Sequence, residues 1–204
     1  MGTAEKWLVP TEVKSLEAHK KFRRAGDSEG QELEFSVGDF WRWAYSDLRE
    51  NYLRGILAEF LVAKALGIEL SVRSSWDDYD LTTSEGIRIE VKAGGYLQSW
   101  KQKELSKLVF GRLRGRAWSD VDGFASEKSV RADIFVFCVQ TATSHDEYDA
   151  LDIGQWELFV IPGGIIETRN TDTISLGVVK RLAPSVPFAK LNDAVRNAAG
   201  LNKC

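Results

Sequence analysis

Hydrophobic residues recur at helical spacing in the first third of the chain. Between residues 51 and 66 they fall three or four positions apart, as on one buried helix face, and Gly67 then offers a C-terminal stop. The apolar positions of this segment are Leu53, Ile56, Leu57, Phe60, Leu61 and Ala65. Upstream, Ser36 is a candidate N-cap for an aromatic-rich run. The pattern therefore predicts helices over residues 37–45 and 51–66.

After Gly67 the spacing of apolar residues changes to that of β-strands. Strands are predicted at residues 68–72, 80–83 and 87–91. Ser84-Glu85-Gly86 lies between the last two and has the composition of a short hairpin turn. The two later strands should therefore pair with each other in antiparallel fashion.

The second half of the chain contains two continuous apolar runs, at residues 134–139 and 156–161, that are typical of buried strands. Pro162-Gly163-Gly164 ends the second run. Residues 174–182 are open between a strand and a short helix, and residues 186–199 predict a terminal helix. This order of elements predicts an α/β fold in which a mixed central sheet is flanked by helices.

Length and composition set the expected domain organisation. The chain has 204 residues, of which 44% are hydrophobic and 28% are charged, which is enough for one well-formed core. We therefore expect a single domain over residues 1–204. Residues 1–30 are polar and charged, and they predict a loosely packed N-terminal helix followed by a turn.

Several classes of protein are disfavoured by features that the sequence lacks. There is no run of eighteen apolar residues, so no membrane span is expected, and the N-terminus has no apolar signal-peptide core. Cys138 and Cys204 lie far apart, and the chain has 2 His, so neither a disulfide framework nor a His-rich metal site is expected. The default location is the cytoplasm.

The overall charge is mildly acidic, with a net charge of −3 and a pI near 5.6. This argues mildly against a non-specific nucleic-acid coat protein, which is usually basic, but it does not exclude an enzyme that gathers carboxylates at its site and keeps its basic residues local. Basic residues cluster locally at residues 14–24, read as a solvated surface, and at residues 101–116. For the second cluster a solvated face and a phosphate-binding surface are equal alternatives. Its candidate nucleic-acid-binding residues are Lys101, Lys103, Lys107, Arg112, Arg114 and Arg116.

Candidate chemistry lies in two neighbouring predicted strands. Alternation puts Glu90 and Lys92 on one strand face and Ile89 and Val91 on the other. A hairpin returning from Asp80 would bring its carboxylate beside Glu90, and two adjacent carboxylates favour a cation between them. Oxygen ligands with room for water suit Mg²⁺ or Mn²⁺, and Lys92 would orient or deprotonate a water or offset charge on phosphorus. The plain alternative is an edge hairpin with surface charges and a cross-strand ion pair.

Glu59 stands out in the second predicted helix because apolar residues surround it. A buried Glu without a partner is costly, so either it lies on a narrow polar stripe or it faces a positive partner. On a helix packed against the hairpin, Glu59 would reach the same cation or Lys92. We therefore count Glu59 among the candidate catalytic and metal-binding residues.

A helix Glu, a strand Asp and a strand Glu-x-Lys, in this order, resemble the PD-(D/E)xK nuclease superfamily. This superfamily includes restriction endonuclease-like proteins and archaeal Holliday-junction resolvases. The match runs from Arg54 to about Trp100, and the order of elements continues it to Val139. The resemblance implies a restriction endonuclease-like αβββαβ core.

The resemblance also assigns roles to residues. It implies that Asp80 and Glu90 bind metal, that Lys92 is the catalytic lysine and that Glu59 holds a metal-bound water. The chain departs from the superfamily pattern at the Pro-Asp position, where there is no Pro and several Asp residues compete. Asp80 is chosen because the apolar pattern resumes directly after it, and Asp78, on the same strand face, is the reserve ligand.

The function implied by the resemblance is Mg²⁺- or Mn²⁺-dependent hydrolysis of phosphodiester bonds, as an endonuclease ahead of an exonuclease and in DNA ahead of RNA. Roles in restriction or defence and in repair both fit. Gln98, a polar residue after the lysine strand, is an auxiliary candidate, with a surface loop amide as the alternative. A homodimer is a candidate assembly, since cutting two strands needs two sites. The alternative function is a catalytically silent nucleic-acid- or protein-binding module on the same fold.

Overall fold

The computed structural model describes residues 13–23, 32–74, 77–119 and 123–201. The chain divides into two compact units. The first unit comprises Met1–Ser46 and Leu70–Ser74, and the second comprises Asp47–Glu69 and Ser75–Cys204.

In the first unit, strands β1 (Lys21–Arg23) and β2 (Glu32–Ser36) pair antiparallel and lead into helix α1 (Val37–Tyr45). Ser36 and Asp39 form a capping box, in which the Ser36 N–H donates to the Asp39 carboxylate over 2.8 Å. The helix and the N-cap predicted from the sequence are both present.

The helix expected over residues 1–30 is absent from the described part of that stretch. Residues 13–20 are irregular and are followed by β1, and the rest of the stretch lies outside the described residues. The Lys20 carbonyl accepts the N–H of Val37 at 2.9 Å, and the Ala18 carbonyl accepts that of Gly38 at 2.7 Å. These carbonyls therefore bind the first turn of α1, and they are not available for a local helix of their own.

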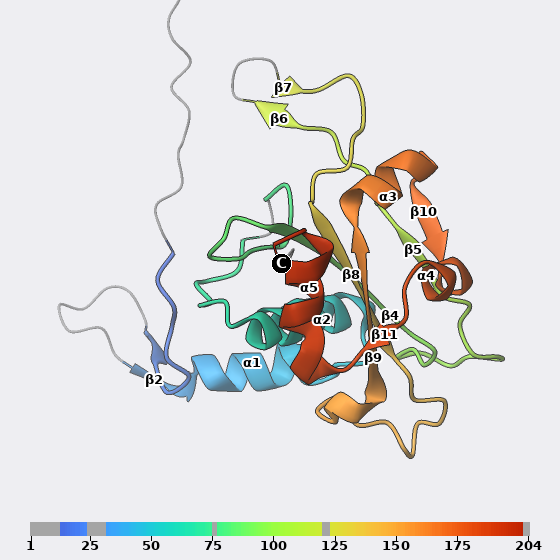
Figure 1. The fold of residues 1–204 in the computed structure, drawn as a ribbon. Helices are drawn as coiled ribbons and strands as arrows, with labels where there is room; N and C mark the ends of the chain where they lie inside the picture. Colours follow the sequence, from blue (N-terminus) through green and yellow to red (C-terminus); the bar gives the residue numbers. More distant parts are fainter. Residues whose placement is uncertain (1–12, 24–31, 75–76, 120–122, 202–204) are drawn as a thin grey trace, which may run out of the picture. The chain divides into compact units, whose positions relative to one another are not determined.

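The second unit is built on a five-stranded sheet with the order β11-β9-β8-β4-β3 (Figure 1). The strands are β3 (Leu81–Thr82), β4 (Arg88–Gly95), β8 (Ile134–Gln140), β9 (Trp156–Pro162) and β11 (Ser185–Val186). Strands β4 and β8 run parallel, whereas the other neighbouring pairs are antiparallel. The sheet is therefore mixed, as the sequence predicted.

Two smaller ladders complete the described strands. Strand β5 (Val109–Gly111) pairs with β10 (Thr173–Ser175), and β6 (Trp118–Ser119) pairs with β7 (Gly123–Phe124).

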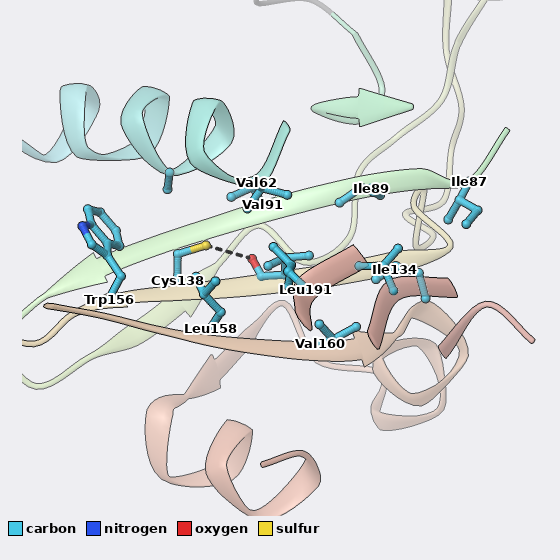
Figure 2. Close-up of a cluster of buried hydrophobic side chains, with 13 residues drawn as sticks. Val62, Ile87, Ile89, Val91, Ile134, Cys138, Trp156, Leu158, Val160 and Leu191 are labelled. Carbon is cyan, nitrogen blue, oxygen red and sulfur yellow. Dashed lines mark hydrogen bonds between the residues drawn. The ribbon is translucent and has the colours of Figure 1, made fainter. Parts of the chain in front are cut away.

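Helices cover both faces of the central sheet. Helices α2 (Asn51–Leu66) and α5 (Leu191–Ala198) pack on one face, in a cluster that includes Val62, Val91 and Leu191 (Figure 2). Helices α3 (Gly163–Arg169) and α4 (Leu176–Leu182) contribute to a second cluster on the other face, around the Phe residues of β8. Strand β8 lies between the clusters and all its residues are buried, which accounts for its continuous apolar sequence.

Most predicted elements lie where the apolar pattern put them. Helix α2 has the predicted ends, and Gly67 terminates it in the left-handed conformation at φ 68°. Residues 174–182, left open between strand and helix, contain β10 followed by α4. None of the described helices is long and apolar enough to cross a membrane. Cys138 on β8 is buried and free, and Cys204 lies outside the described residues.

Besides the N-terminal helix, three predicted elements differ from the structure. The helix predicted over residues 186–199 begins only at Leu191, because Val186 belongs to β11, which pairs with β9. The strand predicted at residues 68–72 is irregular, because Leu70 and Val72 are 39% and 42% exposed and the segment has no buried face to hold it in a sheet. The described residues between β4 and β8 contain short strands and no helix. The helix that the αβββαβ order places in that connection therefore has no counterpart among those described residues, and the next α-helix, α3, follows β9.

A pair of adjacent glycines tests the packing of α3 against the sheet. A Cβ atom at Gly163 would overlap the backbone oxygen of Ala132, whereas a Cβ atom at Gly164 would meet nothing within 4 Å. Gly163→Ala should lower the free energy of unfolding by about 2 to 3 kcal/mol in urea denaturation. Gly164→Ala is the matched control and should change it by less than about 0.5 kcal/mol. Equal stability of the two variants would contradict this packing.

Candidate active site

The candidate site is built on the β3–β4 hairpin. Leu81 pairs with Ile89 across this hairpin, and Gly86 makes the turn at a φ of 81°. The Asp80 N–H donates to the Ile89 carbonyl at 3.0 Å, and the Asp80 carboxylate accepts the N–H of Val91 at 2.7 Å. The Asp80 side chain therefore occupies the edge of β4 at the point where β3 begins.

Alternation along β4 separates its apolar and charged side chains. Ile89 and Val91 are buried in the cluster beneath α2. Glu90 and Lys92 lie on the other face, in register with Phe135 and Phe137 of β8. Lys92 Nζ donates to Glu90 Oε1 at 2.6 Å, and the two side chains are 15% and 19% exposed. The charged face of β4 is thus a largely buried ion pair rather than an open surface.

Asp80 is an unusual carboxylate electrostatically. Burial, with the neighbouring negative charge of Glu90, raises the pKa of Asp80 from 3.8 to about 7. Glu59 raises it further, while the Val91 N–H and the Lys92 ammonium act in the opposite direction. Burial and the nearby carboxylates therefore outweigh the stabilisation that Lys92 and the Val91 N–H give to the charged form of Asp80.

Glu59 is linked to this site through its electrostatic effect on Asp80. It lies on α2, which packs against the sheet through Ala58 and Val62, and its side chain is partly buried. Its charge acts on Asp80. Asp80, Glu90 and Lys92 thus lie together at the edge of β4, and Glu59 lies within electrostatic range of Asp80.

The reserve ligand Asp78 lies in a different environment. Its side chain is 40% exposed and pairs with Arg131, from the segment that precedes β8. Asp80, two residues later, accepts its hydrogen bond from β4 and feels the charge of Glu90. The structure therefore places Asp80, and not Asp78, beside the Glu90–Lys92 pair.

The carboxylates of this site suit a hard divalent cation. Among the described residues, no group of three or more His, Cys, Asp or Glu side chains is arranged to hold a metal ion. Mg²⁺ needs fewer protein ligands than that, because it commonly keeps several waters and binds through one or two carboxylates together with substrate phosphate oxygens. Asp80 and Glu90 supply two such carboxylates, and a cation beside them would stabilise the charged form of Asp80, which burial and the charge of Glu90 disfavour.

The basic stretch after β4 is largely solvent-facing, but it is not uniform. Exposed members are Lys101, Lys103, Lys107, Arg112 and Arg116. Arg114 instead ties two segments together, donating to the Lys128 carbonyl at 2.7 Å and pairing with Glu167 at 3.2 Å. Arg114 is therefore held by protein partners, whereas the other five are accessible.

Gln98 is not the surface loop amide that one interpretation of the sequence allowed. It is 6% exposed, and its Nε2 donates to the Gly95 carbonyl at 3.1 Å and to Ser106 Oγ at 3.0 Å. It fixes the chain that leaves β4 and belongs to the framework beside the site.

Sequence reasoning missed Arg54. It is 2% exposed and lies one and two turns before Ala58 and Val62 on the buried face of α2. A cation at that spacing on an apolar face was the available signal, because a buried charge requires a compensating environment.

Comparisons with known proteins identify no family. No family model matches the chain, and no curated protein matches it. A solved structure of a bacterial homing endonuclease, I-Ssp6803I, is similar over 75% of this chain and 98% of that chain, with a TM-score of 0.36 and 17% sequence identity. A likeness of this degree assigns neither a family nor an activity.

The raised pKa of Asp80 predicts how stability depends on pH. Because the folded pKa of about 7 exceeds the unfolded value of 3.8, Asp80 stabilises the fold at low pH, and this contribution is lost as pH rises from about 4 to about 7. Asp80→Asn keeps an oxygen to accept the Val91 N–H and removes the charge. With chelator present at about pH 8, it should raise the free energy of unfolding by about 2 to 4 kcal/mol.

Urea denaturation at about pH 4.5 and about pH 8 measures this difference. The gain should be small at the lower pH, where folded Asp80 is already protonated. A variant that is less stable than the wild type at the higher pH would contradict this description of the site.

Proposed function

We propose that this chain is a divalent-metal-dependent nuclease that hydrolyses phosphodiester bonds, with DNA as the expected substrate. The observation that carries the proposal is the placement of Asp80 beside the buried Glu90–Lys92 pair, with the charge of Glu59 reaching the same point. Two carboxylates and a lysine at one strand edge are the groups that metal-assisted phosphodiester hydrolysis uses.

Each residue has a role that its position allows. Asp80 and Glu90 would hold Mg²⁺ or Mn²⁺, which when bound offsets the charge that develops on the phosphate and the leaving oxygen. Lys92, held by Glu90 at 2.6 Å, would donate a hydrogen bond to a phosphate oxygen or to the attacking water. Glu59 would accept a hydrogen bond from that water and so fix its direction of attack.

The sequence supports the same assignment. The order helix Glu, strand Asp, strand Glu-x-Lys resembles the PD-(D/E)xK superfamily, and the preference for DNA over RNA rests on that resemblance. A silent binding module on this fold is the competing function. It needs no carboxylate pair at the edge of β4, whereas this chain has Asp80, Glu90 and Lys92 together.

Plasmid cleavage tests the proposal directly. Supercoiled plasmid, linear duplex and single-stranded DNA are incubated with Mg²⁺ or Mn²⁺, beside a chelator control. Lys92→Met removes the ammonium but keeps most of the side-chain volume, and it should slow cleavage by at least about a hundredfold. Lys128→Met is the matched control, since Lys128 is a half-exposed lysine paired with Asp172, and it should cleave at the wild-type rate.

Either of two results would overturn the assignment. Cleavage by Lys92→Met at the wild-type rate would remove the lysine from the chemistry. Failure of the wild type to cut any of these DNA substrates or a single-stranded RNA added to the set, together with metal binding that does not depend on Glu90, would favour the silent module.

A further inference from the structure

A pocket of about 310 Å³ lies at the far end of β4 from the hairpin turn. Strand β3 covers β4 only as far as Ile89, so the edge of β4 beyond that point has no partner strand among the described residues. The pocket is lined by Asn51, Arg54, Ala93, Gly94, Gly95, Gln98, Ser106, Lys107, Leu108, Val109 and Phe110. Two of these side chains are cationic and none is a carboxylate, so the lining favours an anion.

Arg54 supplies a buried positive charge to this pocket. Its guanidinium donates to Asn51 Oδ1 at 2.9 Å, to the Leu97 carbonyl at 2.7 Å and to the Arg49 carbonyl, all of them neutral oxygens. Its Nε is buried without a hydrogen-bond partner. A guanidinium placed this way is only partly compensated, and an anion beside it would lower its cost of burial.

The carboxylates that act on Arg54 through space are bound elsewhere. Glu50 caps α2 by accepting the N–H groups of Tyr52 and Leu53, and Asp47 pairs with Arg49 at 3.0 Å. Neither carboxylate lines the pocket. The positive charge of Arg54 is therefore available to a ligand in the pocket.

Hydrogen-bond donors also converge on the pocket. Ser106 Oγ accepts N–H groups from Gln98 at 3.0 Å and Gln102 at 3.1 Å, so its own hydroxyl hydrogen is left to donate outward. In β4, alternation places the N–H groups of Ala93 and Gly95 on the same edge as that of Val91, away from β8. A hydroxyl and two backbone amides thus accompany the two cations.

Gly95 is the residue that admits the Arg54 guanidinium. A Cβ atom at Gly95 would lie 3.0 Å from Arg54 Nε and 3.1 Å from Cζ, closer than ordinary contact. Any other side chain here would push the guanidinium away from the backbone of β4. The glycine and the arginine therefore form one structural unit.

We propose that this pocket binds a phosphodiester group of a nucleic-acid strand, next to the phosphate at Asp80, Glu90 and Lys92. The identity of the ligand as nucleic acid rests on the proposed function. Lys92 and Gly94 are about 7 Å apart along the strand, a span comparable with the separation of neighbouring phosphates on one nucleic-acid strand. The pocket thus holds the substrate strand in place beside the reacting bond.

Binding without cleavage tests this site. Fluorescence anisotropy of a labelled single-stranded DNA oligonucleotide is measured with chelator present, so that the result does not depend on catalysis. Lys107→Glu should weaken binding at least about tenfold and reduce the slope of log affinity against log salt by about 1. Lys103→Glu makes the same charge change on an exposed residue that does not line the pocket, and it should weaken binding less than about threefold.

A second pair of variants tests the contribution of Arg54 without deleting its charge. Gly95→Ala displaces the guanidinium and should weaken binding at least about threefold. Gly55→Ala is the matched control on the same helix, since its Cβ would meet nothing within 4 Å, and it should bind as the wild type does. Thermal unfolding confirms that each variant is folded.

Equal losses in Lys107→Glu and Lys103→Glu would overturn the proposal, because they would indicate a diffuse basic surface. Undiminished binding by Lys107→Glu would overturn it as well. If the wild type cleaves with metal but Lys107→Glu and Lys103→Glu lose DNA binding equally, the pocket is refuted and the nuclease proposal stands. A Lys107-specific loss of binding without any cleavage by the wild type would refute the nuclease and leave the pocket intact.

Discussion

The parallel pairing of β4 with β8 is the constraint on which the candidate site depends. Seven consecutive residue pairs, from Ile89 with Ile134 to Gly95 with Gln140, fix β4 along one edge. This register turns Val91 toward α2 and leaves Glu90 and Lys92 on the other face. On the opposite edge, no strand of the described residues pairs with β4 beyond Ile89, and the Asp80 carboxylate accepts the N–H of Val91 there.

The cost of this arrangement is concentrated in Asp80. A short β3 brings a carboxylate to a buried strand edge beside Glu90, and burial together with that charge raises the pKa of Asp80 to about 7. A purely structural protein would gain stability with a neutral amide at this position. Unfavourable electrostatics that a substitution could readily remove are characteristic of functional sites, where stability is exchanged for activity.

Fold elements whose partners lie on one buried face were predictable from the sequence. The apolar periods of α2 and β4 each follow from burial of one face, and the continuous apolar run of β8 follows from burial on both faces. The segment at residues 68–72 also alternates apolar and polar residues, but it pairs with no strand among the described residues. The local sequence pattern does not show whether a partner strand is present. The conformation of the described N-terminal residues likewise depends on α1, because the first turn of α1 donates hydrogen bonds to the carbonyls of Ala18 and Lys20.

Those parts of the candidate site that depend on local sequence patterns were also predictable. Placing Glu90 and Lys92 on one face of a strand needs only alternation, and a short hairpin brings Asp80 beside them. The choice between Asp78 and Asp80 depends on Arg131, which pairs with Asp78 across 53 positions of the sequence. Arg54 was overlooked because its role depends on Gly95 and on the loop that follows β4, which adjoin it only after folding.

The central claim is that Asp80 and Glu90 form a cation site, and titration calorimetry with Mn²⁺ at about pH 8 tests it most directly. The wild type should bind the ion, and Asp80→Asn and Glu90→Gln should each weaken that binding at least about tenfold while remaining folded. Mn²⁺ affinity that is unchanged in both variants, or no binding by the wild type, would contradict the claim.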